Sequence, residues 1–422
     1  MDLSFVRSEF PALAQADAQG RPYVYLDGPG GTQVHRSVIE AMARYLTESN
    51  ANHGGAFVTS QRSDDMIAAA RAAMADFFNA PSADEIIFGP NMTTLTFHIS
   101  RTIGKLLRPG DEVVTTLLDH NANVAPWLRL AEQGVVVRQV HFHPEDCTLD
   151  MDEMRRAINL RTRVVAVGYA SNGVGTINDV AEITRWAHQV GAWSYIDAVH
   201  YAPHGPIDVQ AIGCDFLVCS AYKFFGPHEG VLWGRREVLE QLRPDKVRPA
   251  PNDVPHRFET GTQNHEAIAG TLAAVEYLAS LGRRAGVAFK ADYPHLMGRR
   301  LELKAALAAI RAYERELVWP LIEGLQAIPG LKVWGITDPA RAAWRAPTVS
   351  FTLEGHTPRE IAERLGAEGI FVWDGNYYAL TLMEELGLEE KGGMVRVGLA
   401  HYNTAEEVQR LVEAVRRARM RD

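Results

Sequence analysis

Lys223 and Asp197 are the residues whose types and spacing indicate chemistry most directly. Asp197 follows the predicted strand 194–196, and Lys223 lies shortly after the predicted strand 216–219, 26 residues further along the chain. An ionised carboxylate at the end of a buried strand is costly unless a cation pairs with it. A lysine between an apolar strand and two phenylalanines loses hydration, which lowers its pKa and makes it a usable nucleophile. Taken alone, Lys223 is more typical of a surface lysine with a buried stem.

Other predicted strands also end in polar residues. Met92 and Thr93 begin a helical pattern, so their backbone N–H groups and the Thr93 hydroxyl could bind a phosphate-type anion. Ser220 lies directly after the strand that precedes Lys223, and His120 follows another strand. Each could instead be structural, the threonine as a helix cap and the histidine as part of a loop.

Together these residues match the needs of pyridoxal phosphate. Lys223 would bond the aldehyde of the cofactor, and Asp197 would keep its pyridine nitrogen protonated so that the ring withdraws electrons. The Thr93 region and Ser220 would hold the phosphate, and His120 would stack on the ring. The combination is more specific than any one of its members.

Short apolar runs that alternate with helical patterns would position these residues. Such alternation predicts an α/β fold with a mainly parallel sheet covered on both faces. Ligands of such sheets gather at the carboxyl ends of the strands, which is where the polar residues above lie. The predicted strands cover residues 85–88, 112–116, 135–140, 164–167, 194–196 and 216–219.

The alternation weakens beyond Leu281. Residues 295–328 form one long helical pattern that contains Pro320, which is expected to kink or break the helix. Strands near 349–353 and 394–399 and helices near 358–368 and 405–416 then predict a smaller α+β unit. We therefore expect a large cofactor domain over residues 25–290, a small domain over 291–422, and an N-terminal segment, 1–24, that packs on the small domain.

Composition excludes several other classes of protein. The 422 residues are 46% hydrophobic and 23% charged, as in ordinary globular chains. Three cysteines without a CxxC pair predict neither a disulfide framework nor a metal site and favour the cytoplasm. A net charge of −9 disfavours a nucleic-acid partner, and no apolar run is long enough to predict a membrane span.

The sequence resembles the class V aminotransferases, which are fold-type I pyridoxal phosphate enzymes, and within them the cysteine desulfurase-like branch. The resemblance extends along nearly the whole chain. The motifs that carry it are YLDGPGGTQ from Tyr25, DHNAN from Asp119, SNGVGT from Ser171, DAVH from Asp197, SAYK from Ser220, FETGT from Phe258, and Arg396 with the HYNT that begins at His401.

The resemblance implies roles around the cofactor. Asn172 would contact its phenolic oxygen and the substrate region, and Met92 would lie beside it. His200 stands where the family usually has Gln, and Tyr222 where it usually has His; both would still lie near the cofactor. Thr262 matches a threonine that reaches the phosphate in the neighbouring subunit, which implies a homodimer with shared active sites.

The resemblance also implies a substrate site. Arg396 would bind the α-carboxylate, a task suited to a planar guanidinium. His53 matches a histidine that faces the active site, and Gly30 lies in the first family motif. In desulfurases a loop near the C-terminus carries the cysteine that takes up sulfur. Here Tyr378 aligns with that cysteine, and Trp373 aligns with a usual arginine.

All three cysteines lie roughly 150 or more residues upstream of this loop, so a persulfide formed by the family's route is not expected. We predict β-elimination or C–S cleavage on a cysteine-type amino acid, because that branch is the most similar and elimination needs no loop cysteine. Transamination and epimerisation of another amino acid are alternatives, since they begin with the same loss of the Cα proton. An alternative of another class is a non-catalytic regulator or scaffold. The aromatic residues of the loop suggest a bulky substrate or a lid that excludes water.

Overall fold

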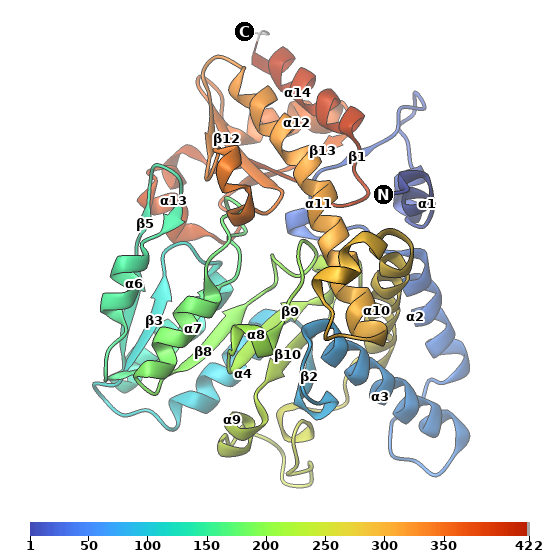
Figure 1. The fold of residues 1–422 in the computed structure, drawn as a ribbon, viewed down its shortest axis with the longest axis vertical. Coiled ribbons are helices and arrows are strands. Elements are labelled where there is room, and N and C mark those ends of the chain that lie inside the picture. The colour runs from blue at the N-terminus through green and yellow to red at the C-terminus, as the bar shows by residue number, and fades with distance from the viewer. Residues whose placement is uncertain (420–422) are drawn as a thin grey trace.

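A seven-stranded sheet forms the centre of the larger part of the molecule (Figure 1). The computed structural model describes residues 1–419. The strand order is β2-β10-β9-β8-β7-β3-β4; only β10 runs antiparallel to its neighbours, so the predicted α/β class with a mainly parallel sheet is confirmed. The strands are β2 (Ile86–Gly89), β3 (Glu112–Thr116), β4 (Val136–Val140), β7 (Thr162–Gly168), β8 (Trp193–Asp197), β9 (Phe216–Ser220) and β10 (Gly230–Gly234).

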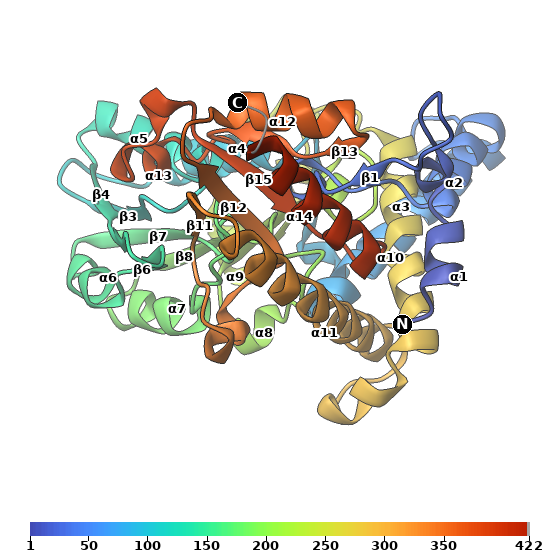
Figure 2. The same cartoon turned by 90° about the horizontal axis from the view of Figure 1, so that it is seen from above.

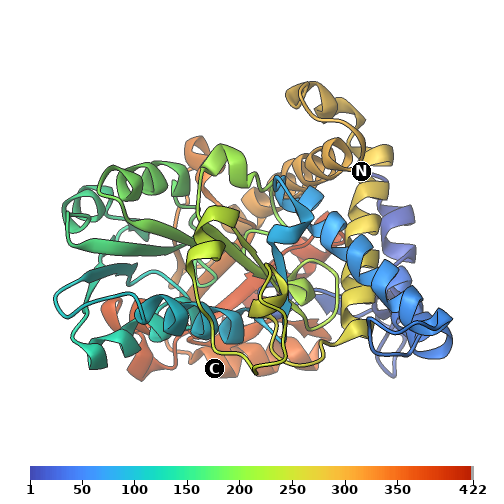
Figure 3. The ribbon, with the colours of Figure 1, turned by 90° about the horizontal axis from the view of Figure 1, so that it is seen from below.

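The two faces of this sheet bury different apolar clusters. Side chains of a strand alternate between faces, and in β9 Phe216 and Val218 belong to one cluster while Leu217 and Cys219 belong to the other. The first face is covered by α4 (Met92–Gly104) and α5 (Ala125–Leu128), and the second by α3 (Val58–Phe78), α7 (Val180–Gln189) and α10 (His265–Ala285). Figure 3 shows α3 and α10 gathered at one end of the sheet, away from α7.

A second, antiparallel sheet forms the smaller unit, with strand order β11-β12-β15-β14. Figure 2 shows α12 and α14 lying across it. Their apolar residues share one cluster with the sheet and with the second half of α11. The elements are β11 (Leu331–Trp334), β12 (Thr348–Leu353), β14 (Trp373–Gly375), β15 (Met394–Gly398), α11 (Gly298–Gln326), α12 (Pro358–Ala367) and α14 (Ala405–Arg419).

Helix α11 links the two units and continues through Pro320 without ending (Figure 1). Its residues up to Ile310 pack in the core of the large unit, and from Leu317 onward they pack in the core of the small unit. The change of packing partner therefore falls inside this helix. The boundary near residue 290 stays a prediction from pattern.

The N-terminal segment contacts both units. Strand β1 (Val24–Tyr25) pairs in parallel with β13 (Ile370–Phe371) of the small unit. Phe10 instead packs edge-on against Phe225 and Tyr277, which belong to the large unit. The segment thus helps to hold the two units together.

The remaining elements are short or peripheral. None of the helices in residues 1–419 has the length and apolar character needed to cross a membrane. Nor do these residues place three His, Cys, Asp or Glu side chains so that they could hold a metal ion. The short or peripheral elements are α1 (Leu3–Ser8), α2 (Arg36–Glu48), α6 (Met151–Ala157), α8 (Val209–Ile212), α9 (Arg236–Gln241), α13 (Leu380–Glu385), β5 (Phe142–His143) and β6 (Thr148–Leu149).

Candidate active site

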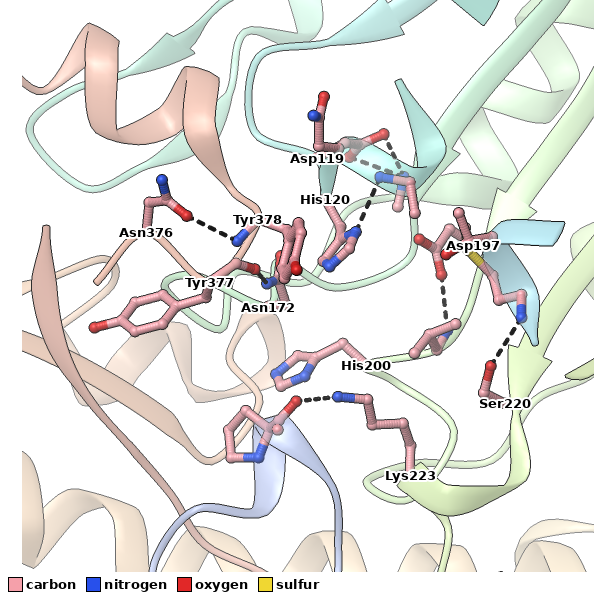
Figure 4. A pocket seen from close by; sticks show the side chains of 18 of the residues that line it. Asp119, His120, Asn172, Asp197, His200, Ser220, Lys223, Asn376, Tyr377 and Tyr378 are labelled. Carbon is pink, nitrogen blue, oxygen red and sulfur yellow. Dashed lines mark hydrogen bonds between the residues drawn. The ribbon is translucent and has the colours of Figure 1, made fainter. Parts of the chain in front are cut away.

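A cavity of about 880 Å³ opens at the carboxyl ends of the large sheet, where the small unit meets it (Figure 4). Thirteen of the fifteen side chains or backbone positions predicted for the site line this one cavity. They are Gly30, Met92, Thr93, His120, Asn172, Asp197, His200, Ser220, Tyr222, Lys223, Trp373, Tyr378 and Arg396.

Lys223 lies on the single helical turn that follows β9, and its amine points into the cavity (Figure 4). Nζ donates a hydrogen bond to the carbonyl of Pro29 and lies 4.8 Å from the centroid of the Tyr222 ring. Burial, together with the smaller effect of the nearby Arg396 cation, lowers the pKa of Lys223 to about 7. A substantial fraction of this amine is therefore neutral at neutral pH and able to act as a nucleophile or base.

Asp197 ends strand β8 and is almost completely buried. Oδ1 accepts a hydrogen bond from the Val199 N–H at 2.9 Å, and this is the only hydrogen bond to the carboxyl group within residues 1–419. Burial raises its pKa to about 6, while Lys223 opposes the rise. A carboxyl group with a free oxygen facing a cavity is suited to bind a protonated ring nitrogen.

The N-terminus of α4 provides the predicted anion site. Asn91 caps the helix by accepting a hydrogen bond from the Thr94 N–H at 2.9 Å. The Met92 N–H donates to the Ser220 hydroxyl at 3.1 Å, which joins the start of the helix to the end of β9. Backbone N–H groups at a helix start together with two hydroxyls suit a phosphate group.

His120 lies beside the cavity with its ring held in place. Its Nδ1 accepts a hydrogen bond from the Ala122 N–H at 3.0 Å, and its ring stacks on Tyr378 with centroids 5.6 Å apart. Burial lowers the pKa of His120 to about 4, so the imidazole is neutral. Next to it, Asp119 binds the Gly168 N–H, and burial raises the pKa of this carboxyl to about 7.

Asn172 and His200 bring further polar atoms to the cavity. Asn172 Nδ2 donates to the Tyr377 carbonyl at 2.9 Å, whereas its buried Oδ1 has no partner among the described residues. His200 Nε2 lies 2.9 Å from the Thr348 hydroxyl, and burial holds the pKa of His200 well below its usual value. An unsatisfied buried amide oxygen at a cavity wall indicates a polar ligand there.

Arg396 lies on β15 of the small unit and reaches across to the large one. Nη1 donates to the Asn172 carbonyl at 3.0 Å, and the guanidinium lies 4.1 Å from the centroid of the Tyr377 ring. Burial lowers the pKa of Arg396 to about 10, which still leaves it charged. No carboxylate within residues 1–419 forms an ion pair with it, and its buried Nε lacks a partner there. A ligand carboxylate would meet both needs.

The loop between β14 and α13 closes one side of the cavity. Tyr377 and Tyr378 both have left-handed backbone conformations, with φ of 55° and 59°. Such angles are unusual for large side chains. Trp373 lies so close to Gly30 that a Cβ at that position would collide with its indole, which gives a steric reason for glycine there.

Some residues of the cavity were not predicted from the sequence. Asp119 could have been found by the strand-end rule, since it directly precedes His120. Asp374, Asn376 and Glu389 also line the cavity. They come from the small unit, and no local pattern in the sequence indicates that they face Lys223.

Two predicted site residues, His53 and Thr262, do not line the cavity of this chain. Both are exposed, and His53 Nδ1 lies 3.9 Å from an oxygen of Asp64. The expectation that His53 faces the active site is therefore not met within a single chain. A role for Thr262 at the site of a neighbouring subunit stays a prediction.

The fold and the lysine-centred cavity together define the architecture of fold-type I pyridoxal phosphate enzymes. Comparison with known proteins gives the particular family. Residues 24–302 and 296–411 match the family described as Aminotransferase class-V, so the chain belongs to the class V aminotransferase family. Its members depend on pyridoxal phosphate, and the chain is an enzyme of that kind.

The most informative relatives are cysteine desulfurases. The chain is 36% identical to one from Synechococcus elongatus, with 99% of this chain but only 63% of that protein covered. It is 33% identical to one from Pectobacterium atrosepticum, with 98% and 97% covered. Among solved structures, the apo cysteine desulfurase of Thermococcus onnurineus superimposes with a TM-score of 0.85 at 26% identity, covering 98% of this chain and 97% of that one.

The residues present fit the cofactor. Lys223 offers the amine, Asp197 a free carboxyl oxygen, and the start of α4 an anion site, all around one cavity. The unsatisfied Oδ1 of Asn172 and the flat face of His120 are also on its walls. Sequence similarity and geometry therefore agree on the cofactor.

Proposed function

We propose that this enzyme cleaves the C–S bond of a cysteine-type amino acid by β-elimination, without forming a persulfide on the protein. The proposal rests on where the three cysteine thiols lie in the molecule. Cys147, Cys214 and Cys219 are all fully buried, none lines the cavity, and burial holds the pKa of each thiol above its usual value. Tyr378, which we align with the sulfur-binding cysteine of desulfurases, lines the cavity.

The residues of the cavity support the steps of this reaction. Arg396 would bind the substrate carboxylate, which fixes the Cα atom relative to Lys223. Pyridoxal phosphate, when bound, supplies an electron sink for the pair left behind by the Cα proton. Lys223 would accept that proton at Nζ, a task suited to an amine whose pKa is near 7. Asp197 would hold the positive charge on the cofactor ring, and His120 would keep the ring in place.

Elimination balances without any further reactant except water. The Cα–H and Cβ–S bonds break, the sulfur leaves as a thiol with one proton, and hydrolysis gives pyruvate and ammonia. For free cysteine the thiol is hydrogen sulfide. No oxidant, reductant or acceptor thiol is required.

We also propose a homodimer in which His53 and Thr262 complete the site of the partner subunit. Their exposure in the single chain, together with the family match, supports this arrangement. The cytoplasm stays the proposed location, on the basis of three free cysteines and no disulfide within the described residues.

A panel of amino acids tests the reaction. The holoenzyme is mixed with each amino acid, and pyruvate, thiol, the pyridoxamine form and deuterium uptake at Cα are measured. Pyruvate with an equal amount of thiol supports elimination. A stable pyridoxamine form would show transamination instead, uptake of deuterium alone would show epimerisation, and persulfide on the protein would refute the argument from the cysteines.

Lys223→Ala tests the assignment of the base. This variant should lose the visible absorption of the lysine-bound cofactor and all turnover, whereas Lys105→Ala, an exposed lysine outside the cavity, should keep both. A wild-type protein that stays colourless after incubation with pyridoxal phosphate would favour a non-catalytic regulator or scaffold.

A further inference from the structure

We propose that Glu389 selects a substrate whose sulfur carries an extended group ending in a cation, as in an S-(aminoalkyl)cysteine. This inference rests on the proposed elimination and names its substrate class. The reacting end of the cavity holds Lys223 and Arg396 together with Asp197. Glu389 lies on another wall, contributed by the turn 389–391 that follows α13.

The size of the cavity points to a substrate longer than cysteine. Its volume of about 880 Å³ lies in the upper part of the range for pockets that hold drug-sized ligands, roughly 300–1,000 Å³. The cofactor site occupies the end near Asp197, and a cysteine bound through its carboxylate to Arg396 ends at its sulfur. The space along the wall formed by Tyr378, Asn376 and Glu389 is continuous with the reacting end.

Glu389 brings to this wall a carboxylate that no basic side chain neutralises. Both of its oxygens accept hydrogen bonds from Asn376 Nδ2, at 3.0 and 3.2 Å. Within residues 1–419 no ion pair joins it to a lysine or arginine. Asp374, the other carboxylate of this wall, is by contrast paired with Arg359 at 3.2 Å. Of these two carboxylates, Glu389 is therefore the one that gains more from a cationic ligand.

Two partly exposed aromatic rings that line the same cavity as Glu389 provide the second observation. The Asn376 side chain accepts a hydrogen bond from the Tyr378 N–H at 3.1 Å, so the same amide connects Glu389 to the aromatic loop. Tyr378 is 72% exposed and Trp373 is 48% exposed, although both line the cavity. Figure 4 shows the Tyr378 ring facing His120, with Asn376 on the side of Tyr378 away from His120. Aromatic faces combined with a carboxylate are the chemistry by which proteins bind ammonium groups.

The reaction expected for such a substrate is balanced. S-(2-Aminoethyl)-L-cysteine would lose its Cα proton to Lys223, its Cβ–S bond would break, and 2-aminoethanethiol would leave with one proton. Water then yields pyruvate and ammonia. The ammonium group of the S-substituent would lie near Glu389 and the aromatic rings, and would take no part in bond breaking.

The test compares three S-substituted cysteines that differ only in the charge of the end group. S-(2-Aminoethyl)-, S-propyl- and S-(2-carboxyethyl)-L-cysteine are titrated into the holoenzyme; dissociation constants come from the cofactor absorption and kcat/KM from thiol release. We expect the cationic compound to be preferred over the neutral one by about five- to tenfold, and the anionic one to be the poorest.

Glu389→Gln keeps an oxygen that can accept from Asn376 but removes the charge, so it should abolish the preference for the cationic compound. Glu390→Gln changes an exposed neighbour that does not line the cavity and should retain the preference. Equal binding of the cationic and neutral compounds by the wild type would overturn the proposal, as would a preference that survives Glu389→Gln.

The two proposals can fail separately. If charge selects binding but no thiol is released from any compound or from cysteine, the elimination is refuted while the role of Glu389 stands. If thiol is released from all three compounds at equal kcat/KM and with equal affinity, elimination stands and the selection by Glu389 is refuted.

Discussion

Tyr377 should control the affinity of the enzyme for its substrate's carboxylate, although it does not contact Lys223. Its ring covers the Arg396 guanidinium at 4.1 Å, and its carbonyl accepts a hydrogen bond from Asn172 at 2.9 Å. The Asn172 carbonyl in turn accepts from Arg396 Nη1. The guanidinium is thus held between the ring and the backbone. We predict that Tyr377→Leu weakens binding through loss of the ring alone.

The size of the expected loss of affinity follows from the burial of Arg396 and Tyr377. Arg396 is 4% exposed, so its cation–π contact with Tyr377 is desolvated and should be worth about 2 kcal/mol. The contact exists with and without substrate, so its loss weakens binding only as far as substrate must order the freed guanidinium again. Since about 1.4 kcal/mol corresponds to a factor of ten, the dissociation constant of the amino acid should rise, with an upper limit of about 30-fold. The conformation of the loop should be kept, because leucine, like tyrosine, has a Cβ and meets the same left-handed backbone.

The assay is titration of L-cysteine into the holoenzyme, followed by the absorption of the cofactor, with KM and kcat measured separately. Tyr377→Phe is the matched control: it keeps the ring and loses only the hydroxyl bond to the Met394 carbonyl, so binding should change by less than about threefold. Cysteamine, which lacks the carboxylate, should bind both variants alike. Equal affinity of Tyr377→Leu and Tyr377→Phe for L-cysteine would refute the reasoning.

Three further predictions concern stability and the shape of the cavity. In the wild type, Arg71 pairs with the buried Glu259 carboxylate at 2.6 Å. Arg71→Met would leave this charge buried without its partner, so the free energy of unfolding in urea should fall by about 3–5 kcal/mol. Burial lowers the pKa of Lys304 from 10.5 to about 7. Between pH 7 and pH 10.5 the unfolded chain therefore binds more protons than the folded one, and the free energy of unfolding should rise with pH. Lys304→Met should remove this rise, which is measured by thermal unfolding at pH 7 and pH 9. Gly30→Ala should displace Trp373 and raise KM several-fold while the unfolding midpoint changes little, since that indole is half exposed and can move; an unchanged KM would contradict the steric role of this glycine.

The cavity joins residues of the large sheet to a wall from the small unit. Lys223, Asp197 and Arg396 line it together. The aromatic loop and Glu389 line it as well, whereas none of the three cysteines does. These features explain why we propose elimination from an extended substrate instead of transfer of sulfur to the protein.

The sequence by itself indicated six of the seven strands of the large sheet, all but β10, together with the fold class and the candidate residues at the carboxyl ends of those strands. Asp197 comes directly after one predicted strand, and Lys223 comes four residues after the end of another. Strands of one parallel sheet bring their carboxyl ends to the same edge, so the proximity of the two residues could be predicted from local pattern. The same rule applies to His120, Ser220 and the start of α4. Each of these positions depends on contacts close in sequence or within one sheet.

Only the tertiary structure decided the other half of the site. Arg396, Tyr377 and Glu389 belong to a unit whose position depends on packing across α11, where the apolar partner changes between Ile310 and Leu317. Local pattern carries no information about how two separately packed cores face each other, so neither the pairing of Arg396 with the Tyr377 ring nor the unneutralised Glu389 could be foreseen. A contact between two subunits does not appear in the structure of one chain, so the roles of His53 and Thr262 stay predictions. Local sequence pattern therefore predicts the residues of the reacting centre, whereas the wall that we propose to select the substrate depends on how the two units pack.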